Sequence, residues 1–164
     1  MTRFPDVDIR QPQPFDMVGT PVNVAGMINI ADEPGTVVVL DADGNELAAS
    51  GTVSATTLGA RDFGVSLDVS SFPTQTGTIV VKMFGGASAE VPVTFGPGLV
   101  ASYDGYGVHV VTSGETLSGI AADIYQDENA WPLIAVANRD IVSDPNLIFP
   151  GQELRFAVDT SKGV

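Results

Sequence analysis

The fold of the C-terminal third is decided by residues 106–121, which read YGVHVVTSGETLSGIA. Residues 108–111 form a short apolar run, which predicts a strand. Thr116 can cap a helix after this strand, because its hydroxyl accepts from the first free N–H groups. The apolar residues that follow recur at the spacing of one helical face: Leu117, Ile120, Ala121 and Ile124.

A second helix and a closing strand complete this unit. Asn129 can cap the second helix, and Pro132 falls in its first turn, where a missing N–H costs nothing. The apolar side of the second helix consists of Leu133, Ile134, Val136 and Ala137. Residues 148–151 predict a turn and residues 152–156 a closing strand. The order strand, helix, helix, strand (βααβ) makes this an α+β domain.

The residues before this unit follow the period of strands. About seven short runs are separated by turn signals, at 7–10, 22–28, 36–40, 46–55, 63–69, 78–84 and 89–95. Their regular spacing favours an all-β immunoglobulin-like sandwich. We therefore expect two domains, a sandwich over residues 1–96 and the α+β unit over 106–158, joined by a Gly- and Pro-containing linker at 97–105.

Charge restricts the partners of the chain. Its 164 residues include 20 acids and 7 bases, a net charge of −13. Phosphate backbones and anionic lipid surfaces repel such a chain, so we expect neither nucleic acid nor membrane as a partner. A cation or a neutral glycan can approach this acidic chain without such repulsion. No apolar run is long enough for a membrane span.

The N-terminus, MTRFPDVD, contains no apolar core of a secretion signal. We therefore expect no signal peptide, and a cytoplasmic chain or one carried in a phage or injection particle; cell-wall association is compatible with release by lysis. Cysteine is absent, so stability must come from packing or from partners.

The C-terminal unit resembles the LysM family. The quoted stretch is similar to the family's opening of a tyrosine, a strand, Gly-Asp-Thr-Leu and an Ile-Ala helix, with Glu115 in place of the common aspartate. Residues 131–134, 137–138 and 144–152, which read WPLI, AN and DPNLIFPGQ, match the rest of the pattern. The resemblance covers about fifty residues in register.

The LysM resemblance implies a binding site. The family binds polymers that contain N-acetylglucosamine, such as peptidoglycan and chitin, in a groove between the first strand–helix loop and the loop before the last strand. Carried onto this sequence, the groove consists of Ser113, Gly114, Glu115, Thr116, Leu117, Asn146, Leu147 and Ile148. A helix N-terminus there would offer N–H groups to acetamide carbonyls.

The N-terminal half resembles the immunoglobulin-like Gmad2 domain of bacterial proteins. The similarity rests on small spaced motifs such as residues 12–14 and 18–26, then 39–44 and 91–93. This resemblance implies an architecture and adds no chemistry.

Neither half predicts catalysis, a metal or a cofactor. His109 is the only histidine, and no Ser, Cys or metal-ligand partner lies at a spacing typical of a catalytic or metal site. We therefore expect His109 to be a half-exposed strand residue. Residues 41–45 echo a calcium loop but lack its later ligands, which favours a hairpin turn. Trp131 opens an amphipathic helix, where packing is favoured over a role as a sugar platform.

Three functions fit these patterns. The first is a non-enzymatic protein whose LysM groove binds peptidoglycan or a chitin-like oligosaccharide. The second is a structural component of a phage tail or contractile particle, in which both domains dock on proteins or self-assemble. The third is a cytosolic potassium-binding LysM protein, which the net charge of −13 favours.

Overall fold

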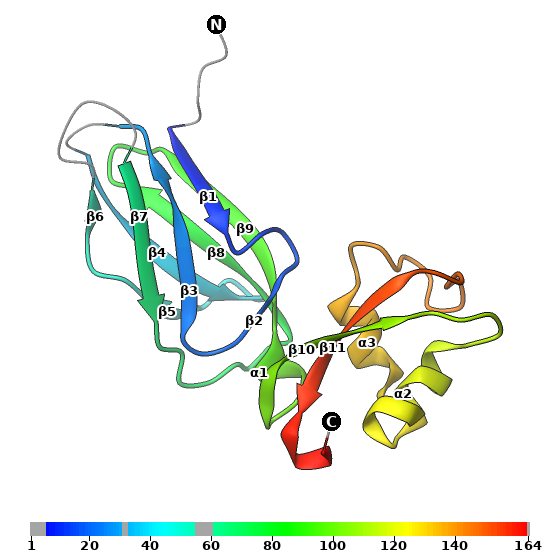
Figure 1. The fold of residues 1–164 in the computed structure, drawn as a ribbon. Coiled ribbons are helices and arrows are strands. Elements are labelled where there is room, and N and C mark those ends of the chain that lie inside the picture. Colours follow the sequence, from blue (N-terminus) through cyan, green and yellow to red (C-terminus); the bar gives the residue numbers. More distant parts are fainter. Residues whose placement is uncertain (1–5, 31–32, 55–60, 164) are drawn as a thin grey trace, which may run out of the picture.

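Two hydrophobic cores form along the chain. The first gathers buried residues between Val7 and Phe95, and the second gathers residues from Leu99 to Ala157 together with Met17. A computed structural model describes residues 6–30, 33–54 and 61–163. Figure 1 shows the two domains that these cores define, with the strand-rich domain first. The expected two-domain organisation is confirmed.

The first domain consists of two layers of strands. One sheet, in the order β1-β3-β7, contains β1 (Val7–Gln11), β3 (Val22–Ile28) and β7 (Arg61–Leu67). The other has the order β2-β9-β8-β4-β5, with β6 paired to β4. Its strands are β2 (Met17–Val18), β4 (Pro34–Asp41), β5 (Glu46–Ala49), β6 (Val53–Ser54), β8 (Thr76–Met83) and β9 (Ser88–Phe95). The first core lies between the layers, since both sheets contribute to it.

The sequence pattern explains these strands. Val22, Val24 and Ile28 of β3 are at most 1% exposed and alternate with more exposed residues, as a half-buried strand requires. Residues 41–45 form the expected turn: the Asp41 carboxylate accepts the N–H groups of Asp43 and Asn45 at 2.9 and 2.8 Å. The short β2, which pairs parallel to β9, was not predicted.

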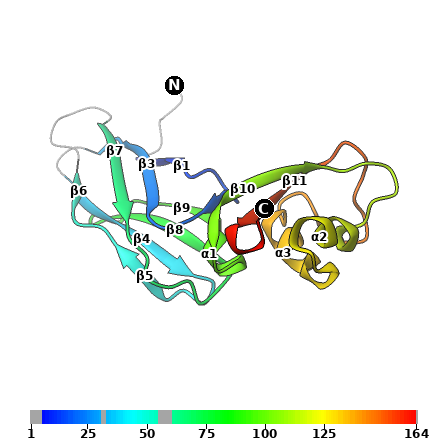
Figure 2. The same cartoon turned by 60° about the horizontal axis from the view of Figure 1, so that its bottom comes forward.

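The second domain places two helices beside one strand pair. Its elements are α1 (Gly96–Leu99), β10 (Tyr103–Val110), α2 (Leu117–Tyr125), the 3₁₀ turn η1 (Glu128–Ala130), α3 (Trp131–Ala137), β11 (Glu153–Asp159) and η2 (Thr160–Lys162). Strands β10 and β11 are antiparallel. Figure 2 shows α2 and α3 on the same side of this pair. Across the described residues, no helix is long and apolar enough to cross a membrane.

One helix start differs from the expectation. Asn129 is not the cap of the second helix; it lies inside η1, where its own N–H donates to the Asp127 carboxylate at 2.9 Å. Helix α3 then begins at Trp131 without a side-chain cap. The extra 3₁₀ turn moves the capping position two residues earlier than the sequence pattern indicated.

The segment at 97–105 is structured. It holds most of α1 and the start of β10, and Tyr103 of β10 packs against the first domain. A Cβ atom at Gly96 would lie 2.2 Å from the Tyr103 ring, and one at Gly19 would lie 3.0 Å from it. Glycine at these two positions therefore makes room for the ring. Burial raises the pKa of Tyr103 to about 12.

Two arginines of the second domain bind the first. Arg139, just after α3, donates to the carbonyl of Val93 at 3.0 Å and to the hydroxyl of Thr94. Its guanidinium also lies 5.0 Å from the centroid of the Phe15 ring, a cation–π contact. Arg155 of β11 donates to the Phe15 carbonyl at 3.2 Å.

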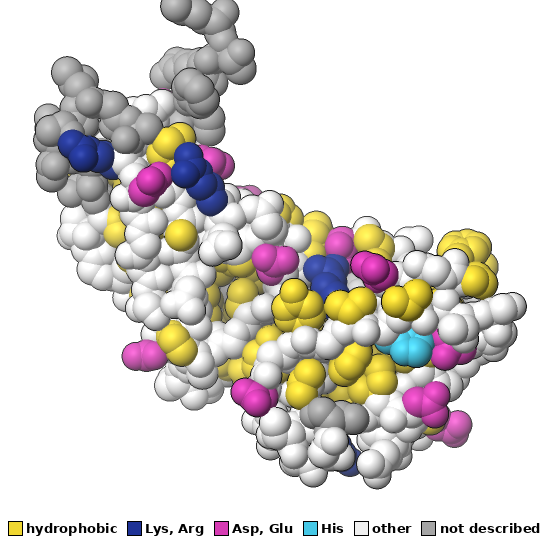
Figure 3. Space-filling view, viewed as in Figure 1, with side chains coloured by type: hydrophobic (Ala, Val, Ile, Leu, Met, Phe, Trp, Pro, Cys, Tyr) yellow, Lys and Arg dark blue, Asp and Glu magenta, His cyan; other side chains and the backbone are white. Residues whose placement is uncertain are grey.

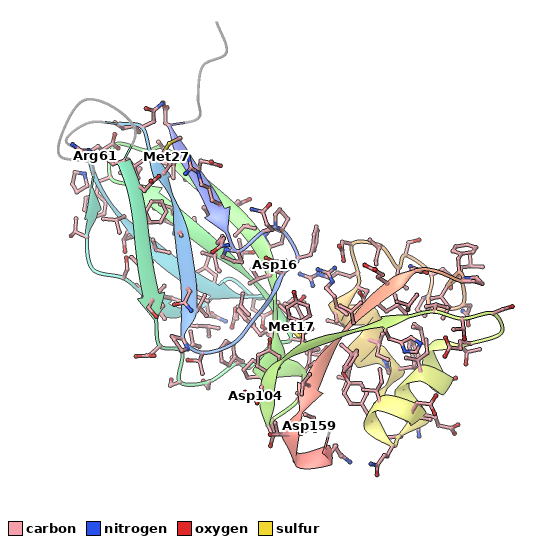
Figure 4. The ribbon with its side chains drawn as sticks, in the orientation of Figure 1. Asp16, Met17, Met27, Arg61, Asp104 and Asp159 are labelled. Carbon is pink, nitrogen blue, oxygen red and sulfur yellow. The ribbon has the colours of Figure 1, made fainter. Side chains whose placement is uncertain are left out.

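Met17 extends this contact into the second core. It belongs to β2 of the first domain, yet it is buried among residues of the second domain. Figure 4 labels Met17 and Asp16 where the two domains meet. Apolar burial and charged hydrogen bonds therefore act together at the domain junction.

Replacing Arg139 by Met tests the junction. The stem of the side chain remains apolar, but the Val93 carbonyl and Thr94 hydroxyl lose a charged donor, which should lower the free energy of unfolding by about 2 kcal/mol. Urea unfolding measures this change. The matched control is Arg10→Met, because the ion pairs of Arg10 are exposed, worth under about 1 kcal/mol, and its further hydrogen bond to the Met27 sulfur stays within the first domain. Equal losses in the two variants would contradict the assigned role.

Candidate functional site

A hollow of about 410 Å³ opens in the second domain. It lies between the start of α2, the start of α3 and the loop before β11. Its lining residues are Glu115, Thr116, Leu117, Ser118, Trp131, Pro145, Asn146 and Ile148. We call this hollow the groove.

The turn from β10 to α2 forms one wall of the groove. Glu115 closes this turn on itself: its carboxylate accepts the Thr112 N–H at 2.6 Å, and its own N–H donates to the Thr112 carbonyl at 3.3 Å. Gly114 has φ of +89°, a backbone conformation that side chains disfavour. The turn therefore depends on both residues.

A side-chain hydrogen bond ties the turn to the sheet. The Glu115 carboxylate lies 3.0 Å from Nε2 of His109 on β10. The Thr112 N–H first, and His109 second, hold the pKa of Glu115 below its usual value. The carboxylate at this edge of the groove thus already has two protein partners.

The first turn of α2 supplies hydrogen-bond donors. Thr116 caps the helix as predicted, since its hydroxyl oxygen accepts the Gly119 N–H at 3.2 Å. It also lies 3.1 Å from the Ser118 hydroxyl. Among the described residues, no acceptor is found for the N–H groups of Leu117 and Ser118. They are the first-turn donors that a helix leaves without an internal partner.

The loop before β11 forms the opposite wall. The Asp144 carboxylate accepts from the backbone N–H of Asn146 at 2.9 Å and from its side-chain amide at 3.1 Å. The Leu147 N–H donates to the Asp144 carbonyl at 2.9 Å. This turn holds the Asn146 side chain beside the groove and leaves its amide oxygen free to accept.

Trp131 gives the groove an aromatic surface. It is 37% exposed at the first position of α3 and lines the groove together with Pro145 and Ile148. The sequence pattern favours packing over a role as a sugar platform for this ring, whereas the structure leaves it partly exposed in the groove.

Five of the eight expected site residues line the groove: Glu115, Thr116, Leu117, Asn146 and Ile148. Ser113, Gly114 and Leu147 do not line it, although Leu147 is 58% exposed nearby in sequence. The sequence did not identify Ser118, Trp131 and Pro145 as lining residues. Ser118 could have been identified as a lining residue from its place in the first turn of the expected helix, directly after Leu117.

The groove suits a polar neutral ligand. It combines backbone donors, an amide, hydroxyls and an aromatic ring, and its single carboxylate is occupied by its own turn. Over residues 6–30, 33–54 and 61–163, no group of three or more His, Cys, Asp or Glu side chains is arranged to hold a metal ion.

Comparisons with known proteins agree with both halves. Residues 6–86 match the family model of Gmad2, described as the immunoglobulin-like domain of bacterial spore germination. Residues 109–156 match the model of the LysM domain. The potassium binding protein Kbp of Escherichia coli O6:H1 is 40% identical over 47 residues, 29% of this chain and 32% of Kbp. The chain therefore matches about a third of the length of that relative.

Replacing Glu115 by Gln tests the turn. The folded state lowers the pKa of Glu115 from 4.5, so its charge stabilises the fold above pH 4.5 and this contribution is lost as the pH falls further. The melting temperature of the variant should lie below that of the parent near neutral pH. The two values should converge as the pH falls below 4.5. A difference that does not change with pH would contradict an ionic role.

Proposed function

We propose that this chain, a Gmad2 immunoglobulin-like domain followed by a LysM domain, is a non-enzymatic protein that binds N-acetylglucosamine-containing glycan. The ligand that we propose is peptidoglycan or a chitin-like oligosaccharide. The observation that carries the proposal is the groove, in which first-turn donors of α2 face the exposed ring of Trp131.

The chemistry of the groove supports an acetylated sugar. The N–H groups of Leu117 and Ser118 suit the acetamide carbonyl, and the amide oxygen of Asn146 suits the acetamide N–H. Trp131 offers a flat apolar face to the C–H side of a sugar ring. The acetamide groups of the polysaccharide carry no charge, so the net charge of −13 on the protein does not oppose its approach.

A single open groove implies weak binding of short glycans. Affinity for a long polymer rises when several grooves act on the same chain. The proposal therefore concerns polymeric glycan, with short oligomers as convenient probes.

Replacing Trp131 by Ala tests the groove. Loss of the ring should weaken binding of an N-acetylglucosamine oligomer roughly tenfold, about 1.4 kcal/mol. Chemical-shift titration with the oligomer measures the affinity, and Trp131→Phe should restore most of it. The matched control is Phe84→Ala, an exposed aromatic residue of the first domain. No shift for the parent protein at millimolar oligomer would refute the glycan proposal.

Potassium binding is a second candidate, favoured by the match to Kbp. The match to Kbp spans 47 residues, and the acidic chain attracts cations. A ligand that binds only the folded state raises the melting temperature, because it stabilises that state by RT ln(1 + L/Kd), where L is the free ligand concentration. We expect the melting temperature to be higher in potassium chloride than in sodium chloride at equal ionic strength if this candidate is correct. Equal values would exclude it.

A further inference from the structure

The two outer edges of the β10–β11 pair differ. Backbone groups along an antiparallel pair point alternately toward the partner strand and away from it. The Val111 N–H donates to the Gln152 carbonyl, and the Val111 carbonyl accepts from Gly151, so odd-numbered residues of β10 point toward β11. Tyr106, Val108 and Val110 must then point away from it.

The outer edge of β11 is closed by side chains. Asn138, at the end of α3, accepts the Arg155 N–H at 2.8 Å and donates to the Arg155 carbonyl at 2.7 Å. The Tyr125 hydroxyl donates to the Ala157 carbonyl at 3.1 Å. Arg155 lies opposite Val108, so these bonds independently confirm which residues point outward. Another strand finds no free backbone groups at Arg155.

The outer edge of β10 is open. Within the described part of the chain, the sheet ends at β10, and no acceptor or donor is found for the outward backbone groups of Tyr106, Val108 and Val110. The side chains of these residues are 57%, 50% and 52% exposed. Figure 3 shows hydrophobic side chains in a row over this strand pair. We call these three residues the open edge.

The open edge lacks the usual protection against strand pairing. Exposed edges are commonly blunted by charged residues or proline. Strand β1, at the edge of the first sheet, carries Asp8 and Arg10. Residues 105–110 contain neither an acid nor Lys, Arg or Pro, although the chain has a net charge of −13. This strip is therefore where a second acidic copy meets the least repulsion.

We propose that β10 pairs with β10 of a second copy in antiparallel orientation, with Val108 opposite Val108. In this register Tyr106 of one copy lies opposite Val110 of the other, so all outward backbone groups of the open edge meet one another. Each such pair exchanges two hydrogen bonds. Directly opposed residues share a face, so the six apolar side chains form one cluster.

The register keeps carboxylates of the two copies apart. In the same register Asp104 lies opposite Thr112, so no carboxylate opposes another along the paired strands. The spacing is symmetric about Val108, which an isologous two-fold contact requires. The result is a continuous four-stranded sheet, β11-β10-β10-β11, with a groove at each end.

The dimer is weak. Stable specific interfaces bury about 1,600 Å² in total, and three half-exposed side chains on each copy supply only part of this area. We expect a dissociation constant on the order of 0.1 mM.

Sedimentation equilibrium of the whole chain between about 10 µM and about 1 mM tests the proposal. The parent should change from monomer to dimer across this range. Val108→Pro removes the outward N–H without removing a donor to β11 and should remain monomeric, and Val108→Lys, which keeps the backbone N–H, should also be monomeric. Phe84→Lys removes an exposed apolar residue elsewhere and should dimerise like the parent.

Amide hydrogen exchange identifies the surface. The amides of Tyr106, Val108 and Val110 should exchange rapidly at low protein concentration and become protected at high concentration, while the amide of His109 changes little. A monomer throughout, with these three amides unprotected, would overturn the proposal and leave the edge to a foreign strand. A dimer that persists in Val108→Lys would overturn it as well.

Discussion

The guanidinium of Arg139 crosses from the end of α3 to strand β9 and holds the two domains in one arrangement. Burial at this contact lowers the pKa of Arg139. The Phe15 ring contacts the Arg139 guanidinium, and the Phe15 carbonyl accepts a hydrogen bond from Arg155. The backbone of Phe15 has φ of +69°. Such a backbone conformation costs about 1–2 kcal/mol and persists because its surroundings fix it. The strained loop and the two arginines therefore stabilise one another.

Most of the fold follows from the printed sequence, because both periods in it are strong. Alternation in β3 and the helical face of α2 each bury the residues that the pattern selected. The misses are local. Strand β2 has only two residues, too few to show a period, and it is defined by pairing with β9 while Met17 packs in the second core. Asp127 and Asn129 are both good caps, and sequence alone gave no reason to prefer Asp127.

The candidate site was predicted in outline and missed in its chemistry. The family pattern identified both loops, because their turns depend on local residues such as Gly114 and Asp144. The His109–Glu115 pair was missed, since it joins a strand residue to a turn across six positions. Trp131 and Pro145 meet at the groove although 14 positions separate them, so the local pattern of α3 did not indicate that this ring lines a site. Binding of glycan or potassium, the domain limits and a place in a phage or injection particle stay predictions.

Strand β10 begins at Tyr103, wedged against the first domain, and ends beside the turn that walls the groove. Its eight residues span about 26 Å. A force on a bound polymer that pulls along this axis would reach the sandwich through one continuous strand. In the glycan-bound state that we propose, the second domain would act as a tension link between the polymer and the sandwich.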